Sequence, residues 1–161
     1  MPGVAVTCDA EIAVMGKGGA RTIKAADFFR GALTTALEPD EIITEVKLPF
    51  WPVERRHAFQ EFARRRGDFA MSGVALFYDP DKSGKATNAH VGVIGVGEYA
   101  RRLPTVEAAI NGNTIDDATI AKAAAAASAA VEPNSDIHAS AAYRKALTGT
   151  LVERALKAAA A

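Results

Sequence analysis

Apolar and polar residues alternate along the first part of the chain with the two-residue period of β-strands. Residues 10–15 and 20–24 predict two strands, and the glycine cluster of residues 16–19 between them suits a hairpin turn. Residues 25–30 predict a short helical turn that ends at Gly31. The chain therefore begins with a small antiparallel unit.

Residues 41–48 predict a further strand, which ends at the prolines of the segment 49–52. Alternate residues of a regular strand share a face. One face would carry Ile42, Thr44, Val46 and Leu48, and the other would carry Ile43, Glu45 and Lys47. Ile43 is then an apolar residue on an otherwise polar face. Two explanations stay open, a partly covered sheet edge or contact with a flat ligand or partner.

Three more strand-like runs follow at residues 57–63, 73–78 and 89–96, separated by turn sequences. Such close spacing favours an antiparallel meander over parallel strands with helical crossovers. A domain boundary is expected near the prolines that precede these runs.

The period changes to that of helices after Pro104. Residues 105–110 predict a short helix, and Thr114 with Asp117 resembles a capping box for a helix through Val131. A last helix is expected over residues 139–158, with an apolar stripe at four-residue spacing. The predicted fold class is α+β, a small antiparallel sheet packed against a C-terminal helical layer.

Composition narrows the functional classes. The chain has 161 residues, 49% of them hydrophobic, with 19 basic and 19 acidic side chains and a net charge of zero. This balance gives no electrostatic case for nucleic acid as a partner. No apolar run is long enough to span a bilayer, so we expect a cytoplasmic protein. The single cysteine, Cys8, cannot hold an iron–sulfur cluster or a structural zinc.

Two short motifs suggest nucleotide or anion binding. Gly95-Val-Gly97-Glu-Tyr-Ala100 matches the dinucleotide pattern, although Pro104 stands where the phosphate-binding helix should continue. The basic run of residues 64–66 could face a partner or an anionic cofactor. The three histidines have no ligand partner at helical spacing, and no nucleophilic triad can be assembled from spacing, so no metal ligand and no catalytic residue is predicted.

Three stretches, taken together and in order, resemble one family. They are Thr35 to Pro49, Phe59 to Ala70 with its Arg-Arg-Arg-Gly-Asp-Phe-Ala sequence, and Asp136 to Arg144 with Asp-Ile-His-Ala-Ser-Ala-Ala-Tyr-Arg. This set resembles the FAD-binding medium subunit of molybdenum hydroxylases, the family of carbon monoxide dehydrogenase and xanthine dehydrogenase.

The resemblance implies an electron-transfer role with FAD as cofactor. Its implied partners are an iron–sulfur small subunit and a molybdopterin large subunit, where substrate would bind. Family members are nearly twice as long, and the glycine loops that hold the FAD pyrophosphate lie upstream of what corresponds to Met1. We therefore expect residues 1–50 to be a remnant of the second FAD-binding subdomain and residues 57–161 to be the C-terminal domain.

The resemblance also implies specific residues. Ile43 takes an apolar position beside the isoalloxazine, and Gln60 takes the position of a family lysine near the flavin, or Glu61 does if the alignment shifts by one. The family signature residues Asp68 and Arg144 are expected to set a turn and to pair with a carboxylate, respectively.

Three hypotheses remain at this point. The first is a fragment or truncated form of the flavoprotein subunit, with weak FAD affinity and no activity of its own. The second is a non-enzymatic assembly module with the same C-terminal fold and no flavin. The third is a nicotinamide enzyme built on the Gly95-Val-Gly97 motif.

Overall fold

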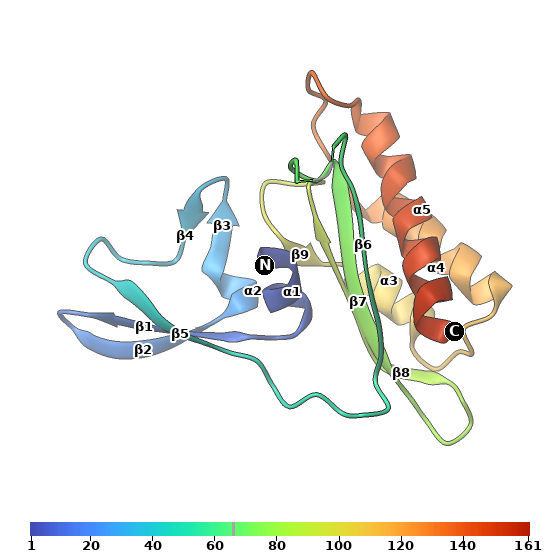
Figure 1. Ribbon diagram of the computed structural model, residues 1–161, viewed down its shortest axis with the longest axis horizontal. Coiled ribbons are helices and arrows are strands. Elements are labelled where there is room, and N and C mark those ends of the chain that lie inside the picture. The colour runs from blue at the N-terminus through green and yellow to red at the C-terminus, as the bar shows by residue number, and fades with distance from the viewer. Residues whose placement is uncertain (66) are drawn as a thin grey trace.

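The computed structural model describes residues 1–65 and 67–161, and Arg66 lies outside them. A three-stranded first sheet and a four-stranded second sheet lie on either side of a short N-terminal helix, and the longer helices lie against the far side of the second sheet (Figure 1). Residues 29–31 and 34–35 pair as a separate two-stranded sheet. The elements in chain order are α1 (Pro2–Thr7), β1 (Glu11–Gly16), β2 (Gly19–Lys24), α2 (Ala25–Phe28), β3 (Phe29–Gly31), β4 (Thr34–Thr35), β5 (Ile42–Lys47), β6 (Arg56–Phe62), β7 (Ser72–Pro80), β8 (Ala86–Ile94), β9 (Arg101–Arg102), α3 (Pro104–Ile110), α4 (Asp117–Ala130) and α5 (Ala141–Ala160).

The first sheet has three antiparallel strands in the order β2-β1-β5. The hairpin predicted at the glycine cluster is confirmed, because β1 and β2 pair from Glu11 with Lys24 up to Gly16 with Gly19. Gly19 has a φ of +104°, a backbone conformation that side chains with a Cβ rarely adopt. This glycine therefore permits the tight turn.

The face predicted for Ile43 is wrong, and a β-bulge is the reason. The pairing of β1 with β5 shifts between Ala13 and Val14, so that Val14 lies opposite Ile43 while Ile12 lies opposite Val46. Directly paired residues of antiparallel strands point to the same face. Ile43 and Val46 therefore share one face, the one on which Ile12 and Val14 are buried.

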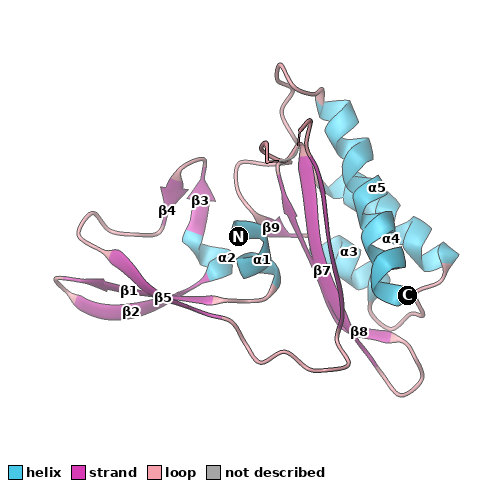
Figure 2. Cartoon of the chain, in the orientation of Figure 1, coloured by secondary structure: helices cyan, strands magenta, loops and turns pink. Residues whose placement is uncertain are grey.

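The second sheet is the antiparallel meander expected from the sequence, in the order β6-β7-β8-β9 (Figure 2). Seven of the nine residues of β7 are buried, since one face packs on α1 and the other on the C-terminal helices. The core on the helix side joins Val74 and Leu76 of β7 with Leu151 and Leu156 of α5. The predicted α+β class, with helices layered on an antiparallel sheet, is confirmed.

The cap predicted for the second C-terminal helix is wrong by two residues. Asp116, not Thr114, is the N-cap of α4, and its side chain accepts a hydrogen bond from the backbone N–H of Thr119 at 2.8 Å. Thr114 instead donates to the Asp116 carboxylate at 3.5 Å. Asp and Ser are both strong caps, and Ser140 plays the same role at the start of α5.

Helix α1 is an element that the sequence pattern did not predict. It packs on the second sheet, although in sequence it directly precedes the strands of the first sheet. A Cβ built on Gly92 of β8 would overlap the Thr7 hydroxyl, and one built on Gly3 would lie 2.8 Å from Ile94. Glycines at these two positions let helix and sheet approach closely, which connects the two halves of the chain.

Candidate functional site

A cavity of about 570 Å³ lies at one end of the second sheet. Two loops build it, the one between β6 and β7 and the one before α5. The lining residues are Arg64, Gly67, Asp68, Phe69, Ala70, Met71, Asp136, His138 and Arg144. These loops carry the family-like sequences at residues 59–70 and 136–144, so two stretches far apart in the chain meet here.

Arg144 closes the inner side of this cavity. Arg144 is only 7% exposed. Its guanidinium donates hydrogen bonds to the carbonyl oxygens of Met71 and Gly95 at 2.8 and 2.9 Å. It also donates to the Asp136 carboxylate at 2.7 Å. The predicted pairing of Arg144 with a carboxylate is confirmed. The Nε atom of Arg144 is buried without a hydrogen-bond partner among the described residues.

Asp136 holds the loop before α5 in place. Its carboxylate accepts the backbone N–H groups of His138 and Ala139 at 2.9 and 3.0 Å, besides the Arg144 guanidinium. The Ala139 N–H, the Arg144 side chain and the His138 N–H lower the pKa of Asp136 to about 2. The carboxylate is therefore ionised at neutral pH and partners the buried Arg144.

Apolar side chains are exposed around the same end of the molecule. Phe69 is 100% exposed, and Ile137 is 92% exposed. Full exposure of a phenylalanine beside a cavity with arginine in its lining suits an aromatic ligand that carries polar groups. The sequence predicted no role for Phe69, and its only signal was its place within the family-like sequence.

The Gly95-Val-Gly97 motif does not form a dinucleotide loop. Gly95 has a φ of +75°, and a Cβ there would lie 2.5 Å from the Ala70 carbonyl oxygen. The Gly95 carbonyl accepts from Arg144, and the next helix, α3, begins only at Pro104. Gly95 therefore serves close packing within the domain, and the motif lacks the strand–turn–helix that phosphate binding needs.

The structure places the two predicted flavin contacts in different sheets. Ile43 lies on β5 and is 47% exposed. Gln60 lies on β6 opposite the fully buried Val74, so its side chain is on the face covered by the helices. Glu61 lies opposite Gly73, on the face that carries α1. The roles of Ile43 and of Gln60 or Glu61 in flavin binding stay predictions.

The hairpin glycines border a second, smaller hollow of about 200 Å³. Three acidic residues line it together with Arg21: Glu38, Asp40 and Glu41. The Arg21 side chain and the Glu38 backbone N–H lower the pKa of Glu41 to about 2, so its charge persists. Three carboxylates against one guanidinium disfavour a phosphate group in this hollow.

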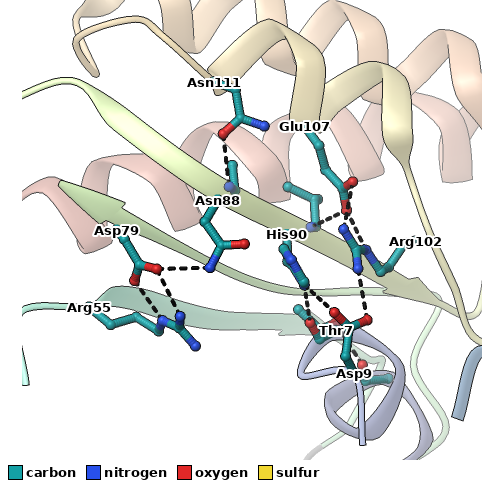
Figure 3. A network of polar contacts seen from close by, with 12 residues as sticks. Thr7, Asp9, Arg55, Asp79, Asn88, His90, Arg102, Glu107 and Asn111 are labelled. Carbon is teal, nitrogen blue, oxygen red and sulfur yellow. Dashed lines mark hydrogen bonds and ion pairs between the residues drawn. The ribbon is translucent and has the colours of Figure 1, made fainter. Parts of the chain in front are cut away.

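A polar network between α1 and the second sheet joins the two halves of the chain (Figure 3). The Nδ1 atom of His90, on β8, lies 2.8 Å from the carbonyl oxygen of Thr7. Because a carbonyl oxygen only accepts hydrogen bonds, Nδ1 must carry the proton. Arg102 bridges Asp9, just after α1, and Glu107 of α3 at 2.8 and 2.7 Å. Glu107 also accepts the backbone N–H of Val91.

The linker between the two sheets is held by a second group of side chains. Arg55 forms a two-pronged ion pair with Asp79 at 2.7 and 2.8 Å. Its guanidinium also lies over the rings of Phe77 and Trp51, at 4.1 and 4.9 Å from their centres. Asp79 in turn accepts from the Asn88 side chain at 2.8 Å (Figure 3). The linker is thereby fixed to the second sheet.

Both parts of the chain match known domain families. Residues 57–159 match the CO dehydrogenase flavoprotein C-terminal domain, and residues 1–51 match the FAD binding domain in molybdopterin dehydrogenase. The chain belongs to the family of FAD-binding medium subunits of CO dehydrogenase-type molybdenum hydroxylases. The cavity loops and the Arg144–Asp136 pair lie within the first of these two matches.

Curated relatives agree with this membership. The chain is 34% identical over 156 residues to the 6-hydroxypseudooxynicotine dehydrogenase complex subunit alpha of Paenarthrobacter nicotinovorans, covering 97% of the chain and 53% of the relative. It is 30% identical over 159 residues to the carbon monoxide dehydrogenase medium chain of Hydrogenophaga pseudoflava, covering 98% of the chain and 55% of the relative. The chain thus spans about half the length of the relatives it matches.

Solved structures give the same fold. The carbon monoxide dehydrogenase of Hydrogenophaga pseudoflava superposes with a TM-score of 0.93 at 31% identity, over 98% of this chain and 55% of that one. Quinoline 2-oxidoreductase from Pseudomonas putida 86 gives 0.91 at 32% identity, over 99% of this chain and 55% of that one. Similarity therefore extends through both sheets and the helices.

The described residues fit one end of an FAD molecule better than the other. Phe69 and the half-exposed Ile43 offer apolar surface of the kind that a flavin ring contacts. The Asp116 and Ser140 side chains each accept one backbone N–H at the N-termini of α4 and α5, and the Asp116 carboxylate would repel a diphosphate at α4. The described residues therefore do not fit the diphosphate.

Two features are absent from residues 1–65 and 67–161. No described helix has the length and apolar character needed to cross a bilayer. The described residues also bring together no group of three His, Cys, Asp or Glu side chains arranged to hold a metal ion.

Proposed function

We propose that this chain supplies the C-terminal half of the FAD-binding electron-transfer subunit of a molybdenum hydroxylase-type oxidoreductase. The observation that carries the proposal is the match of both segments, 1–51 and 57–159, to domains of such flavoproteins, in the order expected. The confirmed Arg144–Asp136 pair and the shared fold support it.

In this proposal the chain works as one part of a cytoplasmic complex. Substrate is oxidised on a molybdopterin-bearing large subunit, and an iron–sulfur small subunit carries electrons to the flavin. We assign no catalytic residue to residues 1–161, and we expect the isolated chain to be inactive. Residues 1–50 act as part of the flavin-binding unit, and residues 57–161 act as the C-terminal domain.

We propose that the isolated chain binds FAD weakly. Contacts to a diphosphate supply much of the affinity of a nucleotide cofactor, and the described residues offer no cradle for it. Ile43 contacts the ring, and Gln60, or Glu61 in the alternative alignment, stands where the family has a lysine. The missing positive charge would change the potential of the flavin.

A fluorescence titration tests this proposal. Purified chain is titrated with FAD, alongside a chimera in which the N-terminal half of the Hydrogenophaga pseudoflava medium chain precedes Met1. We expect micromolar or weaker binding by the chain alone and tight, one-to-one binding by the chimera. Tight binding by the chain alone, or none by a folded chimera, would contradict the proposal.

Two neighbouring variants give a matched control within the same strand. Ile43→Glu and Ile42→Glu place the same charge on opposite faces of β5, because Ile43 pairs with Val14 and Ile42 with Met15. In the chimera we expect Ile43→Glu to weaken FAD binding about tenfold and Ile42→Glu to leave it within about twofold. Equal losses would remove Ile43 as a ring contact.

A second candidate function is an assembly module that keeps the fold and docks on the other subunits without flavin. The capped helix N-termini and the acidic hollow beside the hairpin favour it. Co-purification of iron–sulfur or molybdopterin chains with a colourless protein would support this second function. Thermal unfolding with saturating NAD tests the third hypothesis, and an unchanged transition would eliminate it.

A further inference from the structure

The first and second sheets are joined at two places. One is helix α1, where Thr7 packs on Gly92 and its carbonyl oxygen accepts a hydrogen bond from His90. The other is the linker of residues 48–55, which crosses from β5 in the first sheet to β6 in the second (Figure 1). Two parts of a chain that share only a small interface are expected to move relative to each other. The way the linker is attached therefore bears directly on whether the orientation of the two sheets is fixed.

The linker is held mainly at its C-terminal end. Phe50 and Val53 within it are 86% and 93% exposed. The side chain of Arg55, by contrast, is only 8% exposed. The backbone N–H of Arg55 also donates to the carbonyl oxygen of Pro52 at 3.2 Å, which closes a turn just before β6. The attachment is thus concentrated at Arg55.

Arg55 makes a combination of contacts that requires an arginine. Its guanidinium donates to both oxygens of the Asp79 carboxylate and lies over the rings of Phe77 and Trp51. The centres of these two rings are 5.2 Å apart, so the rings also contact each other. A planar guanidinium can pair with a carboxylate at two points and pack on an aromatic face at the same time, and an ammonium group cannot. Geometry as well as charge therefore fixes this residue.

The carboxylate that receives Arg55 is itself held in place. The pairing of β7 with β8 shifts between Phe77 and Asp79, and Asn88 lies in the resulting bulge with a φ of +49°. Asparagine tolerates a positive φ better than most residues with a Cβ. From this position the Asn88 amide donates to the Asp79 carboxylate at 2.8 Å. The hydrogen bonds from Arg55 and, to a lesser extent, from Asn88 hold the pKa of Asp79 below its ordinary value, so the carboxylate is charged at neutral pH.

Phe77 connects the linker attachment to the one at α1. Its ring stacks on the ring of His90, with centres 4.4 Å apart, and His90 in turn donates to the Thr7 carbonyl. The Arg55 guanidinium lies 4.1 Å from the centre of the same Phe77 ring. Because Phe77 is only 3% exposed, neither neighbour can shift without disturbing a buried side chain. Both attachments therefore act on one rigid part of β7 and β8.

We propose that Arg55 locks the orientation of the first sheet relative to the second. Helix α1 acts as the pivot, and the Arg55–Asp79 pair removes the remaining freedom to tilt. The predicted flavin contacts flank the linker, with Ile43 on β5 and Gln60 or Glu61 on β6, so the lock also sets the spacing between them. The effect on the flavin contacts rests on the proposed function, but the lock itself does not require that the chain bind flavin.

Residual dipolar couplings of the backbone N–H groups test the lock in the 161-residue chain without FAD. We expect the couplings of β1 and β2 and those of β7 and β8 to fit one common alignment tensor. In Arg55→Met they should require two different tensors, because the first sheet then tilts relative to the second. A contact that only stabilises the fold would lower the free energy of unfolding and keep one tensor. A common tensor in folded Arg55→Met, or two tensors in the unchanged chain, would overturn the proposal.

Two further variants control this measurement. Arg56→Met removes the same charge from the next residue, which is exposed, and it should keep the common tensor. Two tensors in Arg56→Met as well would mean that any loss of charge here has this effect, and would overturn the proposal. Asn88→Gly removes only the amide that supports Asp79, since glycine adopts a positive φ without strain. It should also separate the two tensors, and if Arg55→Met does not fold, a common tensor in Asn88→Gly would overturn the proposal.

Flavin titration of the chimera separates the lock from the proposed function. In the chimera, Arg55→Met should weaken FAD binding about tenfold, because the two contacts are then correctly spaced for only part of the time, and Arg56→Met should change it by less than about twofold. If the chimera binds no FAD while Arg55→Met still requires two tensors, the proposed function is contradicted and the lock stands. Tight FAD binding by the chimera together with a common tensor in Arg55→Met would do the reverse. Two tensors with unchanged FAD affinity in Arg55→Met would overturn the effect of the lock on the flavin contacts.

Discussion

The two larger sheets of this protein differ in how fully they are covered. In the second sheet, β7 buries seven of its nine residues between α1 and the C-terminal helices. In the first sheet, β5 buries none of its six. The second sheet with its C-terminal helices, here called the second unit (residues 57–161), therefore has the core of a self-sufficient domain. The first unit (residues 1–50) depends on neighbouring elements for its stability.

The contact between the units explains how the less covered sheet stays folded. Helix α1 buries Val6 in the small core of the first unit, while Thr7 packs against Gly92 of the second sheet. The ion pairs of Arg102 with Asp9 and Glu107 secure the same place. The second unit thus acts as the support on which the first is held.

Truncation in the core of the second unit should have the largest effect. Leu151 is 1% exposed in α5, so Leu151→Ala removes buried methyl groups and leaves a cavity, at a cost of about 4 kcal/mol in the free energy of unfolding. Val46→Ala in the half-exposed β5 should cost less than about 1 kcal/mol. Urea denaturation of both variants measures the difference, and similar costs would contradict the contrast between the sheets.

Loss of the ion pairs where α1 meets the second sheet should have the next largest effect on the free energy of unfolding. Arg102→Met leaves Glu107, which is 8% exposed, without its cationic partner, and we expect a loss of about 2 kcal/mol, reduced because Arg102 is partly exposed. Lys157→Met removes an exposed helix pair with Glu153 and should cost much less, because solvent screens exposed charges. Chemical denaturation gives both values, and equal losses would mean that the network of Figure 3 carries little energy.

The close approach of α1 to the sheet should be felt more locally. In Gly92→Ala the new methyl group meets the Thr7 hydroxyl, which cannot move freely because it donates to the Gly3 carbonyl at 2.7 Å. We expect a loss of about 1 to 2 kcal/mol and faster exchange in α1 and β1. Gly18→Ala, with nothing within 4 Å of the new Cβ, is the control, and an undisturbed α1 in Gly92→Ala would count against the connection.

The smallest effect should appear in acid. The folded-state pKa of Asp136, about 2, lies below its ordinary value of 3.8, so its contribution to stability is full above pH 3.8 and is lost as the pH falls through about 2. Arg144→Met should raise this pKa toward 3.8, incompletely because the Ala139 and His138 N–H groups remain. Carboxyl NMR titration measures it, and an unchanged pKa would refute the assigned cause.

Local sequence patterns predicted most elements, because turn chemistry and periodicity act over a few residues. The glycine hairpin, the meander of β6 to β8 and the helix predicted over residues 105–110, which the structure begins at Pro104, follow from such patterns. Helix α1 was missed because its stability comes from packing on Gly92, a residue far along the chain. The cap at Asp116 was missed because Thr114 offers an equally plausible side chain two residues earlier.

The candidate site was predictable only in part. The pairing of Arg144 with a carboxylate followed from family resemblance, and Asp136 is the partner. The prediction of the face on which Ile43 lies was wrong because a bulge adds one residue to β5. The simple alternation of apolar and polar residues does not reveal such a bulge. The cavity beside Phe69 was missed because it forms only when loops more than sixty residues apart in the sequence meet, at Asp68 and Asp136 for example.

Native-state hydrogen exchange on the 161-residue chain tests the contrast between the sheets most directly. The account predicts that amides of β7 and β8 exchange only through global unfolding, whereas those of β5 exchange at least about a hundredfold faster through local opening. Protection of residues 42–47 equal to that of residues 72–80, in dilute solution without flavin or partner, would contradict it.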